Sequence, residues 1–130
     1  MPKFIFPLLF LLGAAAPCPA TLTDLPVVGL YEDIHLLSAG VRVKSLVDTG
    51  AELSSIDIAL ARQLKLDGPV VRDIYIRTAH GTRRRKVVKL KVKLKDRVLE
   101  QEFTLSERQH MKQKVLLGRN VLKGFLVKVQ

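Results

Sequence analysis

The sequence contains no tryptophan and only one cysteine, Cys18, among its 130 residues. A lone cysteine cannot form a disulfide within the chain, and it provides no cysteine pair for a zinc ribbon or a redox motif. Acidic residues are also few, with 12 Asp and Glu against 22 Lys and Arg, so the formal net charge is +10. This excess favours anionic partners and solubility but does not specify a fold.

Several common catalytic motifs are absent as well. The sequence has no G-x-S-x-G nucleophile elbow, no P-loop and no Rossmann glycine fingerprint. The three histidines, His35, His80 and His110, are far apart and lack H-E-x-x-H spacing, which is more typical of surface or turn residues than of zinc ligands. We therefore predict no metal site and no cofactor.

Long apolar runs are missing except near the N-terminus. The chain starts with a short charged segment, is apolar from Phe4 to Ala16, and then has small residues and proline up to Ala20. This pattern is typical of a secretory signal peptide, and the run is short for a bilayer span. We predict a signal peptide at residues 1–20 and one domain at residues 21–130, with a periplasmic or secreted location and no stable membrane insertion after cleavage.

Other interpretations of the N-terminus are an uncleaved anchor, a buried helix, or a lipoprotein attached through Cys18. The lipoprotein is disfavoured because Pro17 directly precedes the cysteine. Cleavage after Ala20 would remove the only cysteine and leave about 110 residues, enough for one modest core. Such a chain would depend on that core, and on a partner subunit, for its stability.

Alternating apolar and polar residues predict a mainly β chain after residue 20. The clearest case is residues 88–95, where Val and Leu alternate with lysine, so that one strand face is apolar and the other is cationic. Strands are also expected at 27–37 (with a polar break at Glu32-Asp33), 41–47, 70–78, 98–105, 115–117 and 125–129. A short helix is expected at Ile56–Leu66, capped by Ser54 or Ser55, and a helical turn at 120–123. Together these elements predict a small barrel or sandwich.

The region from Tyr75 to Val92 is predicted to form a β-hairpin with a basic tip and a basic outer arm. The simplest interpretation of its lysine row is a solvated strand face that prevents edge-to-edge aggregation. The functional interpretation is contact with an acidic polymer or an acidic substrate.

The stretch SLVDTGAELSS, residues 45–55, places the carboxylate of Asp48 at the end of an apolar strand. Burying an unpaired charge is unfavourable, so this acid needs either a structural role, as a turn residue or helix cap, or a chemical one. About seventy residues later an apolar triplet runs into a glycine in VLLG, residues 115–118.

Three blocks of the sequence resemble, in order, a bacterial subfamily of the retropepsin-like aspartic peptidases, which are single-domain relatives of pepsin. The blocks are VVGLYEDIHL…GVRVKSLVDTGAELSSI, RTAHGTRRRKVVKLKVKL and FTLSERQHMKQKVLLGRNVLKGFLV, and they cover nearly all of the chain after residue 20. The subfamily is often labelled "ATP-dependent zinc protease", but this sequence has neither a nucleotide-binding loop nor a zinc-ligand cluster.

The resemblance implies a small closed barrel of the retropepsin type with one or two short helices, and an aspartic endopeptidase that acts as a homodimer on peptides or proteins. Each subunit would supply one Asp48-Thr49-Gly50 loop, so that two Asp48 carboxylates meet and share a proton. One would act as base on a water and the other as acid toward the scissile carbonyl. Thr49 would brace the two loops, and Gly50 would allow close approach of the substrate.

The resemblance also implies supporting residues. Glu52 would form an ion pair with Arg119, and Gly118 would lie against the catalytic loop with Leu117 packed below it. Solvated charges and a simple turn glycine are the alternatives for these positions. The flap over the substrate would be the hairpin tip, with residues Ala79, His80, Gly81 and Thr82.

Two other functions remain open on the same fold. One is a basic module that binds anionic glycan, lipid headgroups or nucleic acid through residues 83–95, and the other is an inactive regulator. Export and the small number of aromatic residues argue against nucleic acid as a partner. The intact Asp-Thr-Gly sequence argues against loss of activity.

Overall fold

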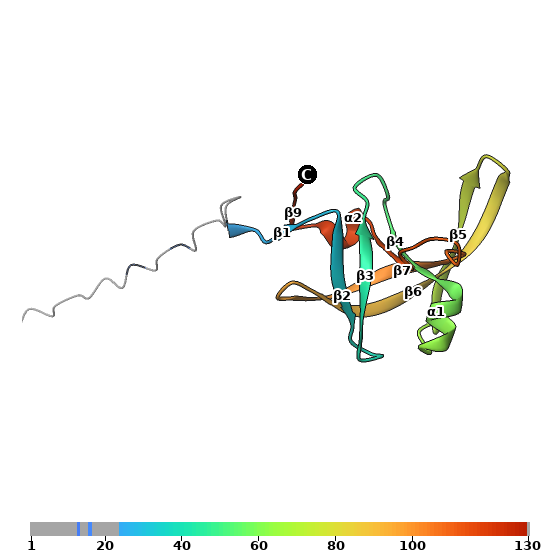
Figure 1. Ribbon diagram of the computed structural model, residues 1–130, viewed down its shortest axis with the longest axis horizontal. Helices are drawn as coiled ribbons and strands as arrows, with labels where there is room; N and C mark the ends of the chain where they lie inside the picture. The colour runs from blue at the N-terminus through green and yellow to red at the C-terminus, as the bar shows by residue number, and fades with distance from the viewer. Residues whose placement is uncertain (1–12, 14–15, 17–23, 130) are drawn as a thin grey trace, which may run out of the picture.

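The computed structural model describes Gly13, Ala16 and residues 24–129. Of the predicted signal peptide, residues 1–20, only Gly13 and Ala16 are among the described residues. Figure 1 shows strands wrapped into a barrel, with one long hairpin that projects beyond it. None of the described residues belongs to a helix that is long and apolar enough to cross a membrane.

The strands are β1 (Val27–Val28), β2 (Tyr31–Leu36), β3 (Val41–Val47), β4 (Ser54–Asp57), β5 (Val70–Thr78), β6 (Gly81–Leu94), β7 (Arg97–Ser106), β8 (Val115–Leu117) and β9 (Leu126–Val127). The helices are α1 (Ile58–Gln63) and α2 (Arg119–Leu122). Seven strands form one sheet in the order β2-β3-β8-β4-β7-β6-β5, and the pairing of β2 with β6 closes six of them into a barrel. β5 lies beyond this ring, next to β6, and β1 pairs with β9 in a separate small sheet. The predicted mainly β closed barrel with short helices is confirmed.

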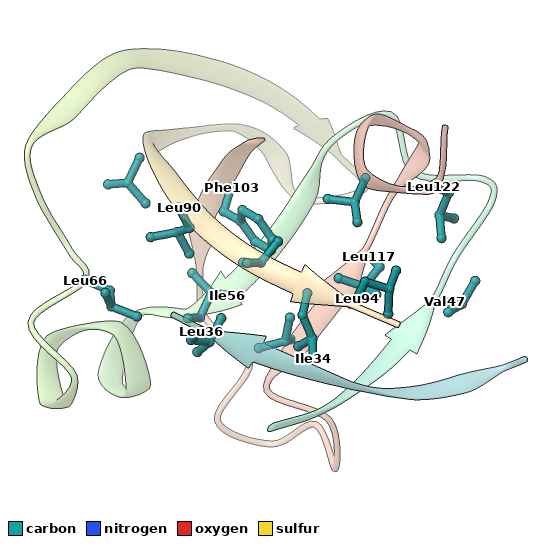
Figure 2. Close-up of a cluster of buried hydrophobic side chains, with 14 of the residues drawn as sticks. Ile34, Leu36, Val47, Ile56, Leu66, Leu90, Leu94, Phe103, Leu117 and Leu122 are labelled. Atoms are coloured by element: carbon teal, nitrogen blue, oxygen red, sulfur yellow. The ribbon is translucent and has the colours of Figure 1, made fainter. Parts of the chain in front are cut away.

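Alternation along the strands fills the barrel interior. The apolar residues of β6 from Val88 to Leu94 are at most 5% exposed, whereas the lysines between them are exposed. Figure 2 shows side chains from several strands meeting in this core. Burial of each large aliphatic side chain stabilises the fold by about 1.5–3 kcal/mol. The half-buried strand predicted from the lysine pattern is therefore confirmed.

The predicted helix at Ile56–Leu66 is wrong at its start. Ser54 to Asp57 form the buried strand β4, which pairs with β7 on one side and β8 on the other. Pairing along both edges of this segment satisfies its backbone groups and outweighs the capping tendency of the two serines. The residue that caps α1 is Asp57, whose Oδ2 accepts a hydrogen bond from the Leu60 N–H at 3.2 Å.

Two strand predictions at the ends of the domain also need correction. The polar pair Glu32-Asp33 lies inside β2, and the chain is interrupted at Gly29-Leu30 instead. Glu32 is partly buried, and its carboxylate accepts a hydrogen bond from the Gly29 N–H and pairs with Lys95. Asp33 is exposed and lies opposite Lys44 on β3. The last strand is restricted to Leu126–Val127, where the chain pairs with β1.

Candidate active site

Asp48, the predicted catalytic carboxylate, sits in a loop that is fixed from two sides. It directly follows β3, and its N–H donates a hydrogen bond to the carbonyl of Leu117 on β8 at 2.9 Å. One of its carboxylate oxygens accepts a hydrogen bond from the Gly50 N–H at 2.9 Å. These contacts hold a half-buried carboxylate in one direction at the end of a buried strand.

β8 runs between β3 and β4 and brings the second signature segment to the Asp48 loop. Leu117 lies opposite Val47 in the parallel β3–β8 pair, and Gly118 follows it. The Gly118 N–H donates a hydrogen bond to Ser54 Oγ at 2.9 Å. A Cβ atom on Gly118 would lie 2.7 Å from the backbone carbonyl of Leu53, so this position has no room for a side chain. Gly118 and Leu117 thus lie next to the Asp48 loop, where the resemblance implies them.

The predicted ion pair between Glu52 and Arg119 is wrong. Among the residues that the structure describes, no ion pair joins these two side chains. Arg119 Nη1 instead donates hydrogen bonds to the carbonyls of Thr49 and Gly50, at 3.2 and 3.4 Å. Exposed ion pairs contribute little, and the carbonyls of a tight loop offer the guanidinium acceptors in a fixed position. The arginine therefore still braces the Asp48 loop, but through its backbone.

Asn120 is a supporting residue that the sequence analysis missed. Its side-chain oxygen accepts hydrogen bonds from the N–H and the Oγ of Ser54, at 2.9 and 2.8 Å. Its amide group donates a hydrogen bond to the carbonyl of Glu102 at 2.8 Å. One side chain thus ties α2 to β4 and β7. The only signal in the sequence was its place directly after Gly118-Arg119.

A groove of about 630 Å³ opens between the Asp48 loop and the β5–β6 hairpin. One side is formed by loop residues 51–53, and the other by hairpin residues that include Ile74 and Ile76. In Figure 1 the hairpin and the loop after β3 extend toward the same side of the barrel. The arrangement leaves room for an extended peptide beside the loop.

The predicted flap residues lie at the tip of this hairpin. The two turn residues are Ala79 and His80, and β6 begins at Gly81. The φ of Gly81 is +112°, a backbone conformation that glycine adopts without strain. The hairpin contributes residues 72, 74–77 and 85 to the lining of the groove, and none of the tip residues Ala79, His80, Gly81 and Thr82.

The groove is cationic, because Arg72, Arg77, Arg85 and Arg108 line it and Glu52 is its single acid. Arg72 is paired with Glu102, which lies outside the lining, and the other three guanidinium groups against one carboxylate still give the groove an excess of positive charge. A peptide that carries acidic side chains would therefore meet a favourable potential there.

Two of these arginines differ in how they are held. Arg72 Nη2 lies 2.7 Å from Glu102 Oε2, and this hydrogen bond lowers the pKa of Glu102. Two hydrogen bonds fix Arg108. Its backbone N–H donates to Asp57 Oδ1 at 2.8 Å, and its Nε donates to the carbonyl of Gln113 at 3.3 Å. Burial is the main cause that lowers the pKa of Arg108, and the positive charge of Arg85 lowers it further.

The lysine row of β6 lies on the outer face of the barrel, and acids accompany it. Lys89 is opposite Glu102 on β7, and Lys91 is opposite Glu100. Opposite charges in such cross-strand positions stabilise a sheet. The positive charge of the lysine row is therefore partly neutralised by these glutamates. Within residues 24–129, no group of three or more His, Cys, Asp or Glu side chains could hold a metal ion.

Comparison with known proteins adds a family match. Residues 59–130, more than half of the chain, match the RimB-like family, described as "Retropepsin-like aspartic endopeptidase RimB". The matched segment includes Gly118 and Arg119 and begins after Asp48. No curated protein matches the chain.

Solved structures with the same fold come from a bacterium and from viruses. A Legionella pneumophila protein of unknown function, Lpg0085, is 21% identical, with a TM-score of 0.56 over 80% of this chain and 93% of its own. The protease of a simian foamy virus is 22% identical, with a TM-score of 0.55 over 71% of this chain and 90% of its own. A foamy viral protease–reverse transcriptase, in complex with an RNA/DNA hybrid, is also 22% identical, with a TM-score of 0.55 over 72% of this chain and 11% of its own. At this level of identity the likeness concerns the fold alone.

Proposed function

The chain belongs to the RimB-like family of retropepsin-like aspartic endopeptidases, and from this premise we propose that it hydrolyses peptide bonds as a homodimer with two Asp48 carboxylates at its centre. The observation that supports the proposal most strongly is the geometry of the Asp48 loop. The loop is fixed by β8 beneath it and by Arg119 at its side, while Thr49 and Gly50 are exposed. A rigid loop with a half-buried acid and an exposed surface suits contact with a second copy of itself.

In this dimer the two Asp48 carboxylates share one proton, because two like charges at short range cannot both ionise easily. The ionised carboxylate takes a proton from a water molecule, whose oxygen attacks the carbon of the scissile carbonyl. The protonated carboxylate gives its proton to the carbonyl oxygen. The tetrahedral intermediate then collapses, the C–N bond breaks, and the amine leaves with a proton. Thr49 of each copy braces the two loops.

Replacing Arg119 with Ala should weaken self-association about tenfold, since a loss of about 1.4 kcal/mol in the interface changes a dissociation constant by that factor. The reason is that the variant loses the hydrogen bonds to the Thr49 and Gly50 carbonyls that hold the loop in shape for its partner. Sedimentation equilibrium measures the effect. The matched control is Arg62→Ala, because Arg62 is an exposed arginine on α1. Unchanged sedimentation of Arg119→Ala would contradict its role at the dimer centre.

We propose acidic peptides as preferred substrates, on the basis of Arg77, Arg85 and Arg108, which line the groove and form no ion pair with any residue that the structure describes. Replacing glutamate by glutamine in a cleaved peptide should lower kcat/KM about tenfold, which corresponds to the loss of one partly desolvated ion pair of about 1.4 kcal/mol. The preference should shrink as salt is added, because exposed charges are screened. Pairs of such peptides, digested in competition and followed by mass spectrometry, give the ratio directly. Equal cleavage of the glutamate and glutamine forms would contradict this assignment.

We further propose that the enzyme works outside the cytoplasm, in the periplasm or as a secreted protein, because residues 1–20 have the pattern of a signal peptide. The mature protein would then begin at Thr21. N-terminal sequencing of the protein recovered from its producing cells tests this, and an N-terminus at Met1 would overturn it.

The alternative function, a basic module that binds an anionic polymer through residues 83–95, has weaker support. Glu102 and Glu100 lie opposite the lysines on the neighbouring strand. Binding through many phosphates or sulfates would collapse steeply with salt, whereas hydrolysis by two carboxylates depends chiefly on pH.

A further inference from the structure

A second hollow lies on another side of the hairpin base, between β6, the end of β7 and the first residue of α1. Its volume is about 410 Å³, and its polar lining consists of Arg83, Arg84, Arg85, Ser106 and Glu107. We call it the β6–β7 hollow. Arg85 is the one residue that it shares with the groove beside the Asp48 loop. The hollow is therefore a separate place on the molecule.

The charges of the hollow are not balanced. Three arginines stand against one glutamate in the lining, and Asp73 pairs with one of these arginines from outside it, which leaves an excess of one positive charge. Arg84 is neutralised by an ion pair with Asp73 on β5, and Arg83 has only a long contact of 3.8 Å with Glu107. Arg85 forms no ion pair with any residue that the structure describes. Guanidinium groups in this position are available to an anion.

The buried hydroxyl of Ser106 is an independent observation, because it lacks a hydrogen-bond partner among the described residues. The residue is 3% exposed, yet its hydroxyl makes no hydrogen bond within the described part of the chain. The nearby Thr104 differs, because its hydroxyl donates to the carbonyl of Ser54. Buried polar groups in proteins are nearly always hydrogen-bonded, so an unpartnered hydroxyl on the wall of a cationic hollow calls for an acceptor.

We propose that the β6–β7 hollow binds a phosphate dianion, either as free inorganic phosphate or as a phosphomonoester. The two negative charges of the dianion face Arg83 and Arg85, the two lining arginines that lack a close ion pair. Phosphate oxygens accept hydrogen bonds from planar guanidinium groups in a bidentate manner, and Arg83 and Arg85 provide such donors. The hydroxyl of Ser106 donates to a further oxygen. A carboxylate, with one charge and two oxygens, would leave part of this donor set unused.

Binding of phosphate does not require peptide hydrolysis, so it can be measured whether or not the enzymatic proposal holds. The full chain is titrated with inorganic phosphate by calorimetry in a phosphate-free buffer at constant ionic strength, with acetate as the monoanionic control. We expect saturable binding of one phosphate per chain and at least about tenfold weaker binding of acetate, as expected if a second charge and further hydrogen bonds contribute. A parallel titration with phenyl phosphate shows whether the site accepts a phosphomonoester. Binding of either phosphate form more tightly than acetate supports the site. The form that binds more tightly of the two identifies the preferred source.

Three variants locate the site. Arg83→Gln and Ser106→Ala should each weaken phosphate binding about tenfold, whereas Arg77→Gln, which changes the groove only, should leave it unchanged. Ser106→Ala should unfold at no lower a temperature than the wild type in phosphate-free buffer, because it removes an unpartnered hydroxyl. The proposal is overturned if the wild type shows no saturable binding, if acetate binds as well as phosphate, or if Arg77→Gln weakens binding as much as Arg83→Gln.

Discussion

Replacing Asp48 with Asn should abolish peptide hydrolysis and leave the fold intact. We expect kcat/KM to fall by at least about 10³-fold, as for other variants that lose a group acting directly in the chemical step. The variant can no longer share a proton between two carboxylates, so neither the base nor the acid of the reaction is available. Asparagine still offers an oxygen to the Gly50 N–H, and the loop therefore keeps its shape.

The measurement uses an unstructured protein such as casein, incubated from acidic to neutral pH, with the products read by mass spectrometry. Asp33→Asn is the matched control, because Asp33 is an exposed carboxylate on β2, and this variant should cleave like the wild type. Equal cleavage by wild type and Asp48→Asn would indicate another site or a contaminating peptidase. No cleavage by the wild type, in a preparation shown to be dimeric, would favour the inactive or binding function.

Replacing Gly118 with Ala should lower the free energy of unfolding by about 2–3 kcal/mol, in the range of overpacking substitutions. The new Cβ would lie 2.7 Å from the carbonyl carbon and oxygen of Leu53 and 2.9 Å from the carbonyl oxygen of Ala51. These are backbone atoms, which cannot rotate away as a side chain would. The φ of Gly118, −92°, suits any residue, so the loss comes from contact and not from backbone conformation.

The same substitution should reduce activity, because the displaced backbone belongs to the loop that carries Asp48. Urea unfolding measures the stability of the variant. Gly29→Ala is a suitable control, since its Cβ would meet nothing closer than 3.8 Å, and its stability should stay within about 0.5 kcal/mol of the wild type. A Gly118→Ala variant as stable as the wild type would show that the loop does not pack on this glycine as described.

Features that depend on neighbouring residues were predictable from the sequence. The alternation from Val88 to Leu94 is local, and it correctly gave a half-buried strand with lysines outside. The end of β3 directly before Asp48 was predictable for the same reason.

Features that depend on distant partners were not predictable in this way. Ser54–Asp57 contains good capping residues, and only its pairing with β7 and β8 makes it a strand. Arg119 was paired with Glu52 on the strength of the family resemblance, whereas its position next to the Thr49 and Gly50 carbonyls follows from how the barrel closes. The hydrogen bonds of Asn120 to Ser54 span 66 residues. Hydrophobic patterning reports which face of a strand is buried, but not which distant segment lies beside it.

The central claim is that one active site needs an Asp48 from each of two chains, and mixing wild-type and Asp48→Asn chains tests it most directly. After the subunits have re-equilibrated, the cleavage rate is measured at constant wild-type concentration and increasing variant concentration. If chains pair at random in two-fold dimers, an equal amount of variant places half of the wild-type chains in inactive mixed dimers, and the rate should fall to about half. A ninefold excess of variant should reduce the rate to about one tenth. A rate that stays constant throughout would show that a single chain carries the whole site, and would contradict the account.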